Sequence, residues 1–560
     1  MVKKWWNEKV AYQIYPKSFY DTNGDGIGDL RGVIEKLDYL KDLGVDIIWL
    51  SPCYRSPLAD QGYDISDYYD IDPRFGTMAD MDELIAEAKK RDMYILMDLV
   101  VNHCSDEHEW FKKACEDPDG KYGNFFYLRD KKEGELPTNW RSYFGGPVWE
   151  DLPGTNKQYL HVFHKKQPDL NWENPAVRQE MYKAMRFWMD RGIAGFRIDV
   201  VNAIKKAPGL PDKDPHKRGL QFPAELVTKQ EGVHTFIQEM HREVFSHYPD
   251  CFTVGEGCLT GIEDVARFTN PENRELMMMF HFDIAMLGCG PLGKFDFRKG
   301  YRFTIRDFKR VVNRWQLAMQ EKNGWTGNYL SNHDQPRQVS RFGSEKTPEL
   351  RRASARALAL LNLTLRGTPF LYQGEECGMT NCRLAKEEWK DFEAINDYAV
   401  LQSMMRLPAP LAEKIIVKMT RDNARTPVQW SGGRNAGFTD GTPWMRVNPN
   451  YREINIEEDV LRMDSVVNFY KKAIALHHAH PALTFGTYAP VDEKNKRVLA
   501  YLRRGETETL LVAINLSDRQ TKVSFPRLNA RECLLYTHSS RTFAQELPLL
   551  PFEGLVYKVN

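Results

Sequence analysis

The sequence contains no long apolar run. Its mean hydropathy is −0.55, and no stretch approaches the roughly 20 apolar residues that a membrane-spanning helix needs. No apolar segment follows Met1–Trp6, so we expect neither a signal peptide nor an anchor. An excess of one charge is also lacking, since 77 Lys and Arg residues balance 77 Asp and Glu residues. This balance argues against nucleic acid or an anionic membrane surface as a partner.

Cysteine is scarce and irregularly spaced. The nine cysteines include no CxxC pair and show no regular spacing, unlike the cysteines of a disulfide framework. We therefore expect free thiols in a reducing compartment, and a soluble cytoplasmic protein. The 560 residues show no internal repeat and suffice for large buried cores.

The first hundred residues alternate between apolar strands and amphipathic helices. Near-continuous apolar strands separated by helices are typical of a parallel sheet that is covered by helices. We expect strands at 10–15, 45–50 and 94–101, a helix at 30–43 that ends at Gly44, and a helix at 81–91.

The alternation is interrupted once and then resumes. Residues 104–173 are rich in Gly, Pro, Trp and charge without a clear period, so we interpret them as an inserted subdomain after the third strand. Eight strand–helix repeats in total predict an α/β fold, the (β/α)8 or TIM barrel, whose active sites lie at the C-terminal strand ends. The later strands are expected at 195–200, 251–254, 276–282, 328–330 and 370–372, and helices at 175–191, 235–248, 305–320 and 349–363.

The pattern changes after about residue 480. Apolar and polar residues alternate at 497–502, 507–514 and 555–559, which predicts a C-terminal antiparallel β-sandwich domain. The predicted organisation is a barrel in two parts with an insertion and a C-terminal domain. The boundaries are 1–103 and 174–480 for the barrel, 104–173 for the insertion and 481–560 for the C-terminal domain.

Acidic residues stand at three predicted strand ends. Asp199 follows Arg197 by two positions in an apolar strand, Glu256 ends the next strand, and Asp334 follows the seventh. A charge inside a strand is costly unless it is paired or reaches a polar site, so Arg197 and Asp199 form either a structural ion pair or part of a site. Strand ends converge in a barrel, and two neighbouring carboxyl groups are what glycoside hydrolysis requires.

Two histidines accompany these acids. His103 and His333 are each preceded by Asn and each lie at a predicted strand end. A single histidine would more simply be a satisfied core or surface residue. Two in the same setting favour hydrogen bonding to sugar hydroxyl groups.

Four segments in a fixed order resemble the signature segments of the α-amylase family of glycoside hydrolases. Four further stretches are similar to its branch of oligo-1,6-glucosidases, dextran glucosidases and trehalose-6-phosphate hydrolases: Gln167–Trp172, His333–Arg337, Tyr372–Glu376 and Arg421–Pro427. The resemblance spans essentially the whole chain. The signature segments are Asp98-Leu-Val-Val-Asn102-His103, Gly195-Phe-Arg197-Ile-Asp199, Val254-Gly-Glu256 and Asn332-His333-Asp334.

The resemblance implies a retaining α-glucosidase that removes terminal non-reducing glucose. Asp199 would be the nucleophile and Glu256 the general acid and later base, with the two carboxyl groups about 5–5.5 Å apart. Glu256 would have a raised pKa while Asp199 stays ionised, and Asp334 would hold sugar hydroxyls and favour the distorted ring. The subsite for the terminal glucose would be lined by His103, Arg197 and His333 and closed by Asp60, Tyr63 and Arg425, with Phe163 and Gln167 near the leaving sugar.

Val200 directly follows the proposed nucleophile. In the resembling branch, valine at this position accompanies cleavage of α-1,6 links, whereas α-1,4-specific relatives carry a smaller residue or threonine. The physical idea is steric, because a branched side chain beside the leaving group admits a flexible 6-linked sugar better. Valine is also a common strand residue, so simple packing is the alternative. We expect isomaltose and isomalto-oligosaccharides to be preferred.

Residues 21–29 space oxygen ligands at alternate positions, as a calcium loop does. Gly32 stands where an EF-hand has its glutamate, so the loop is not an EF-hand. It resembles the metal loop of the same glucosidase branch, which implies a structural Ca²⁺ and no cofactor for catalysis. The alternative is a glycine-rich turn with solvated acids. The implied ligands are Asp21, Asn23, Asp25, the backbone oxygen of Ile27, and Asp29.

Other activities remain open. A trehalose-6-phosphate hydrolase would need a cationic patch for the phosphate, which Lys165–Lys166 or Lys205–Lys206 could supply. A sucrose-active enzyme or an α-1,4-glucosidase is also possible, although Gly288–Asp296 departs from the loop typical of sucrose isomerases. Non-catalytic relatives that serve amino-acid transporters have lost the carboxylates that this chain retains. The expected partner is a small oligosaccharide or disaccharide, bound by a monomer or weak oligomer.

Overall fold

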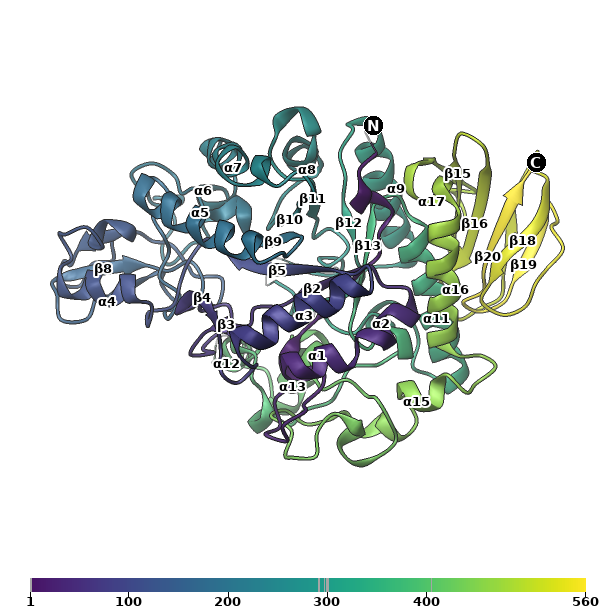
Figure 1. Ribbon diagram of the computed structural model, residues 1–560, viewed down its shortest axis with the longest axis horizontal. Helices are drawn as coiled ribbons and strands as arrows, with labels where there is room; N and C mark the ends of the chain where they lie inside the picture. Colours follow the sequence, from purple (N-terminus) through teal and green to yellow (C-terminus); the bar gives the residue numbers. More distant parts are fainter. Residues whose placement is uncertain (1–2, 291–292, 297, 299–301, 404) are drawn as a thin grey trace. The chain divides into compact units, whose positions relative to one another are not determined.

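The computed structural model describes residues 3–290, 293–296, 298, 302–403 and 405–560 (Figure 1). Eight strands form one sheet in the order β11-β10-β9-β5-β2-β1-β13-β12, and the pairs with a defined register are parallel. The predicted (β/α)8 barrel is thereby confirmed. Its strands are β1 (Ala11–Ile14), β2 (Ile47–Leu50), β5 (Tyr94–Val100), β9 (Gly195–Asp199), β10 (Phe252–Glu256), β11 (Met278–Phe280), β12 (Gly327–Asn328) and β13 (Thr368–Tyr372).

Helices separate these strands along the chain, as the sequence predicted. The chain divides into two compact units: unit 1 comprises residues 1–48, 87–93 and 283–560, and unit 2 comprises 49–86 and 94–282. The helices are α1 (Leu30–Glu35), α2 (Leu37–Leu43), α3 (Met78–Lys90), α5 (Pro175–Asp190), α6 (Ala224–Thr228), α7 (Gly232–Glu243), α8 (Ile262–Thr269), α9 (Ile305–Glu321), α10 (Gln338–Phe342) and α11 (Pro348–Thr364).

Strands β9 and β10 of unit 2 are buried along their whole length and pair in parallel. Gly195 begins β9 with a φ of 150°, and a Cβ atom there would lie 1.8 Å from the carbonyl oxygen of Phe252. Only glycine permits this close approach. The pairing brings Asp199 and Glu256, the last residues of the two strands, to the same end of the sheet.

The predicted helix at 30–43 is two helices. The backbone leaves the helical conformation at Lys36, where φ is −97° and ψ is 4°. The Lys36 ammonium lies 3.9 Å from the ring centre of Tyr20 and 4.5 Å from that of Trp430, and these cation–π contacts favour the break. The predicted end at Gly44 is confirmed, since its φ of 99° is left-handed.

The inserted residues 104–173 contain a small sheet and a helix that the sequence pattern did not reveal. The antiparallel sheet has the order β6-β8-β7, and its strands are too short to show a clear period. Trp140, Trp149 and Leu160 form part of its core. The elements are α4 (Glu109–Glu116), β6 (Leu128–Asp130), β7 (Trp149–Asp151) and β8 (Lys157–Leu160), and a further hairpin pairs β3 (Tyr54–Arg55) with β4 (Asp67–Ile71).

The C-terminal residues form an antiparallel β-domain, as predicted. A five-stranded sheet has the order β14-β15-β16-β20-β18, and β17 pairs with β19. Within unit 1, helices α11 and α16 (Val466–Ala479) contact each other, and both contact strands of this domain (Figure 1). The strands are β14 (Thr487–Val491), β15 (Val498–Arg504), β16 (Thr509–Asn515), β17 (Thr521–Ser524), β18 (Ala530–Tyr536), β19 (Glu546–Leu549) and β20 (Gly554–Val559).

Several helices beyond β13 were not predicted from the sequence. Helices α12 and α13 contact each other, with Trp389, Tyr398 and Ile416 in their shared core. These helices are α12 (Phe392–Ser403), α13 (Ala409–Met419), α14 (Asp422–Arg425), α15 (Ile456–Asp459) and α17 (Pro481–Phe485).

Residues 291 and 292 of the stretch Gly288–Asp296 lie outside the described residues.

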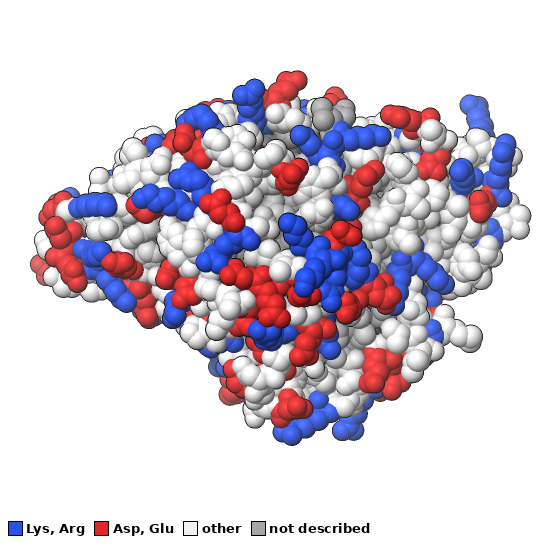
Figure 2. Space-filling model, viewed as in Figure 1, with Lys and Arg blue, Asp and Glu red and all other residues white. Residues whose placement is uncertain are grey.

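The surface charge follows the balanced composition. Acidic and basic side chains are interspersed over the face shown in Figure 2. All nine cysteines are free thiols. Within the described part of the chain, no helix combines the length and apolar character needed to cross a membrane.

Candidate active site

Asp199 and Glu256 share one arginine. Arg197 donates from Nη1 to Asp199 Oδ1 at 2.6 Å and to Asp98 Oδ1 at 2.8 Å, and its Nη2 lies 2.7 Å from Glu256 Oε2. The Arg197 side chain is only 1% exposed. A buried cation is tolerated when carboxylates pair with it in this way. Arg197 therefore holds the ends of β9 and β10 as one charged cluster.

Burial and like charge both act on Asp199. Burial raises the pKa of the Asp199 carboxyl well above its usual value, the Arg197 guanidinium opposes this rise, and the Glu256 and Asp98 carboxyls add to it. The direction differs from the expected ionised Asp199, because three carboxyl groups face a single guanidinium. Burial and the neighbouring carboxyl groups therefore make Asp199 harder to ionise than an exposed aspartate.

Val200 adopts a backbone conformation that is unusual for valine. Its φ is 33° and its ψ is 43°, a left-handed geometry that is strained for a β-branched residue. In this conformation its backbone N–H donates to Glu256 Oε2 at 3.2 Å. The sequence argument assigned Val200 only a steric effect, and the structure adds a contact with the neighbouring carboxyl group.

Predicted sugar-binding residues of unit 2 form a second cluster. Gln167 Nε2 lies 3.1 Å from Asp60 Oδ2, from the Tyr63 carbonyl oxygen and from His103 Nε2. The ring of Phe163 lies 5.3 Å from that of His103 between ring centres. Gln167, expected near the leaving sugar, thus contacts the residues that were expected around the terminal glucose.

Asp98 links the two clusters and was missed as a functional residue. Besides its contact with Arg197, its Oδ2 accepts from the Tyr63 hydroxyl at 2.9 Å and from Trp49 Nε1 at 3.2 Å. The signal was available, because Asp98 is a charged residue inside an apolar strand, just as Arg197 is. The Asp98 side chain is fully buried, so its charge needs these partners.

Within unit 1, Asp334 lies close to His333, Arg421 and Arg425. Arg425 Nη2 donates to Asp334 Oδ1 at 2.8 Å, and His333 Nε2 lies 3.0 Å from Oδ2. Burial alone would raise the pKa of Asp334, but His333, Arg421 and Arg425 outweigh it and hold that pKa well below its usual value. Asp334 is therefore an anion. Gln13 was not predicted here, and its Nε2 lies 2.7 Å from His333 Nδ1.

Three of the four lysines considered for a phosphate form ion pairs. Lys206 is buried and lies 2.8 Å from Asp169, and Lys205 pairs with Glu173. Lys166 lies 2.9 Å from Asp106. These ion pairs remove most of the free positive charge that a phosphate group would require.

The carboxylates of the loop at residues 21–29 accept hydrogen bonds from nearby backbone N–H groups and from one hydroxyl group. Asp21 Oδ2 accepts from Gly26 N–H at 2.7 Å and from the Thr439 hydroxyl at 2.5 Å. Asp29 Oδ1 accepts from Gly32 N–H at 2.7 Å and so caps α1. Among the described residues no group of three or more His, Cys, Asp or Glu side chains is arranged to hold a metal ion. The loop still offers oxygen atoms alone, which is the donor chemistry that Ca²⁺ prefers.

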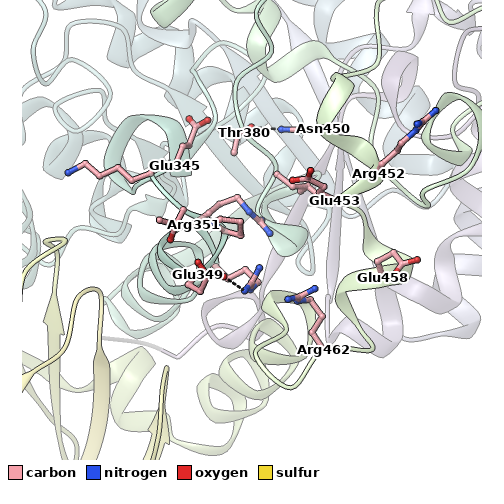
Figure 3. Close-up of a pocket in the computed structure, with 14 residues that line it drawn as sticks. Glu345, Glu349, Arg351, Thr380, Asn450, Arg452, Glu453, Glu458 and Arg462 are labelled. Carbon is pink, nitrogen blue, oxygen red and sulfur yellow. Dashed lines mark hydrogen bonds and ion pairs between the residues drawn. The ribbon is translucent and has the colours of Figure 1, made fainter.

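Unit 1 also carries a polar pocket of about 560 Å³, to which Arg351, Glu349 and Glu453 contribute (Figure 3). Arg351 donates to the carbonyl oxygens of Cys377 and Gly378 at 3.1 and 3.0 Å. The described lining residues carry both charge signs and include no aromatic side chain and no residue of the signature segments. This pocket therefore lacks the stacking surface typical of sugar sites, and we do not assign it to substrate.

Comparisons with known proteins agree with this site. Residues 13–486 match the family described as "Alpha amylase, catalytic domain", and residues 488–543 match "Maltogenic Amylase, C-terminal domain". The chain is 46% identical to an oligo-1,6-glucosidase of Parageobacillus thermoglucosidasius over 100% of both chains. It is 42% identical to a trehalose-6-phosphate hydrolase of Bacillus subtilis (strain 168), covering 99% of this chain and 98% of that one.

Solved structures of related enzymes have the same fold as this chain. The isomaltulose synthase of Klebsiella sp. LX3 superposes with a TM-score of 0.95 at 40% identity, over 100% of both chains. Enzymes with different named activities thus have this fold and sequence similarity in common. With the family match extending over most of its length, this chain belongs to the α-amylase family and is a glycoside hydrolase.

Proposed function

We propose that the protein is a retaining, exo-acting α-glucosidase that prefers α-1,6 links in isomaltose and isomalto-oligosaccharides. The observation that supports this most strongly is the pair Asp199 and Glu256 on the single guanidinium of Arg197. Asp199 Oδ1 and Glu256 Oε2 lie 2.6 and 2.7 Å from nitrogens of this one guanidinium, which fits the close carboxyl pair of a retaining enzyme. Relatives at 44–46% identity over their full length are oligo-1,6-glucosidases.

The proposed mechanism has two displacement steps. Asp199 attacks the anomeric carbon while Glu256 transfers its proton to the glycosidic oxygen, which leaves with the departing sugar. Glu256, now ionised, takes a proton from water, and the resulting hydroxide displaces Asp199 to release glucose with retained configuration. We propose that Asp334, with His333 and Arg425, binds sugar hydroxyls and favours the oxocarbenium-like ring.

The linkage preference is expected to depend on Val200. Wild-type enzyme should show a higher kcat/KM for isomaltose than for maltose, and Val200→Ala should lower this ratio about 10-fold, since removing methyl groups from a contact surface shifts discrimination by that order. Val201→Ala, at the equally buried next residue, is the matched control and should leave the ratio unchanged. Steady-state kinetics on both disaccharides measure the ratio. Maltose preferred by the wild type would contradict the proposal.

The same assay separates the alternative substrates. Trehalose-6-phosphate hydrolysis is disfavoured because Lys166, Lys205 and Lys206 are already ion-paired. Sucrose remains a candidate because isomaltulose synthases share this fold at 40–42% identity. Faster turnover of either compound than of isomaltose would replace the proposed substrate and would leave the two-carboxylate mechanism intact.

We also propose that the loop at residues 21–29 binds a structural Ca²⁺. Its support is the all-oxygen donor set of Asp21, Asn23, Asp25 and Asp29 with the Ile27 carbonyl. Excess EGTA should lower the Tm, because a ligand at a hundred times its Kd stabilises by about 2.7 kcal/mol, and added Ca²⁺ should restore it. Asp25→Ala should remove this response. An identical Tm with EGTA and with Ca²⁺ would rule the site out.

The cellular setting is proposed on similar grounds. The nine free thiols support a reducing compartment, the cytoplasm, which cell fractionation can check. A monomer or weak oligomer is expected, and sedimentation velocity measures it directly.

A further inference from the structure

Lys206 is a buried lysine whose three N–H donors all have oxygen partners. Its side chain is 1% exposed, and Nζ lies 2.8 Å from Asp169 Oδ2. It also donates to Asn102 Oδ1 at 2.6 Å and to the Ala203 carbonyl oxygen at 2.7 Å. An ammonium group has three donors and no acceptor. Lys206 therefore requires the oxygen, and not the nitrogen, of the Asn102 amide to face it.

The orientation of the Asn102 amide follows from this contact. With Oδ1 toward Lys206, Nδ2 points to Asp169 Oδ1 at 3.3 Å and to His103 Nδ1 at 3.1 Å. A flipped amide would set N–H against the ammonium and oxygen against the carboxylate. Both contacts would be repulsive, and neither Asn102 nor Asp169 is exposed to solvent. The amide is locked in one orientation.

This orientation decides where His103 carries its proton. Because Nδ1 accepts a hydrogen bond from Asn102, it is unprotonated, and a neutral imidazole then carries its proton on Nε2. Burial lowers the pKa of His103 to about 3, with a further contribution from Lys206, so the ring is neutral. His103 Nε2 lies 3.1 Å from the Tyr63 carbonyl oxygen, which is an acceptor and fits an N–H at this atom.

Gln167 presents donors to the same place. Its Oε1 accepts from His164 N–H at 3.0 Å, which turns its Nε2 toward Asp60 Oδ2 and the Tyr63 carbonyl oxygen. These two oxygens accept both N–H groups of Gln167, so Gln167 need not donate to His103 Nε2, which lies 3.1 Å from its Nε2. The N–H groups of His103 and Gln167 thus lie close together, with the Asp60 carboxylate beside Gln167. A sugar hydroxyl suits this arrangement, because its oxygen can accept from an N–H while its proton is donated to a carboxylate.

We infer that Lys206 is a positioning residue that acts through Asn102 to hold His103 as the Nε2–H tautomer. The Nε2–H, which faces the Tyr63 carbonyl oxygen, can then be shared with a hydroxyl of the bound glucose. The identity of the ligand rests on the proposed function. The tautomer itself does not, because it follows from contacts within the protein. Sequence reasoning assigned Lys206 to a possible phosphate patch, a role that the buried ion pair with Asp169 makes unsuitable.

Neutron diffraction from deuterium-exchanged crystals of the full chain tests the tautomer directly. We expect deuterium on His103 Nε2 and none on Nδ1. Deuterium on Nδ1, alone or together with Nε2, would overturn the inference. This readout is independent of catalysis. A protein that cleaves no α-glucoside could therefore still confirm the inferred His103 tautomer while the proposed function fails.

A charge exchange tests the functional consequence. Asn102→Asp combined with Asp169→Asn keeps one carboxylate beside Lys206, but the carboxylate at position 102 can only accept, so His103 Nδ1 must carry the proton. We expect kcat/KM for 4-nitrophenyl α-glucoside to fall about 10-fold, mainly through KM, which is the value of one lost hydrogen bond. The loss should vanish for the one monodeoxy glucoside that lacks the hydroxyl bound by His103.

Controls separate this role from a structural one. Lys205→Met with Glu173→Gln removes the neighbouring lysine–carboxylate pair, which does not touch Asn102, and should leave kcat/KM unchanged. Equal losses for every monodeoxy glucoside would show that Lys206 only supports the fold. If circular dichroism shows that the exchange variant does not fold, Lys206→Met with Asp169→Asn removes both buried charges and releases the amide. That variant should then show partial deuterium occupancy on both His103 nitrogens, from a mixture of neutral tautomers. Deuterium on Nε2 alone would contradict the positioning role of Lys206.

Discussion

Asp199→Ala is expected to lower kcat for 4-nitrophenyl α-glucoside about 10⁴-fold or more, as removal of a catalytic nucleophile does in other enzymes. The reason is that Asp199 is the group proposed to form the bond to the anomeric carbon, and alanine offers no nucleophile in its place. Glu256→Ala should reduce hydrolysis strongly for natural disaccharides and less for glucosyl fluoride, because fluoride leaves with little help from an acid.

Added azide distinguishes the two roles by product stereochemistry. In the Asp199→Ala variant, azide should enter the vacated space and displace the leaving group directly, giving the inverted β-glucosyl azide. In the Glu256→Ala variant, azide should instead replace water at the covalent intermediate and give the retained α-glucosyl azide. NMR of the anomeric proton identifies each product. The opposite assignment would exchange the roles, and no azide product from either variant would refute the covalent mechanism.

Glu375→Gln is expected to stabilise the protein increasingly as the pH rises. Burial raises the pKa of Glu375 to about 8, and its Oε1 accepts from the Ser331 hydroxyl at 2.7 Å. The folded state therefore binds more protons than the unfolded state between the unfolded pKa and about 8, and wild-type stability falls across this range. The glutamine keeps the shape without titrating. The gain should be near zero at pH 4.5 and on the order of 4 kcal/mol above pH 8.

Urea unfolding at several pH values measures this difference. Glu457→Gln, at an exposed helical position, is the matched control and should show a pH-independent difference close to zero. If Glu375→Gln destabilised the protein at every pH, the Glu375 carboxyl group would have to be ionised and paired in the folded state. That result would contradict its raised pKa.

The amino-acid sequence by itself determined the barrel strands and the principal carboxyl residues. Periodicity is a local property, so apolar strands such as β9 and long helices such as α5 could be recognised from spacing alone. The four ordered segments likewise identified Asp199, Glu256 and Asp334, because charged residues at the ends of buried strands need a site or a partner. Short strands such as β6 and β7 carry too few residues to show a period, and the helices α12 and α13 were missed as well.

Only the tertiary structure decided how these residues act on one another. The raised pKa of Asp199 depends on burial, on the single charge of Arg197 and on the neighbouring carboxyl groups. The left-handed backbone of Val200 and the partners of Lys206 arise from segments far apart in the chain. Hydrogen bonds and electrostatic energies depend on distances between such segments, which no local pattern encodes. The spacing of residues thus showed which groups the chain possesses, and packing determined which of them are ionised, oriented or engaged.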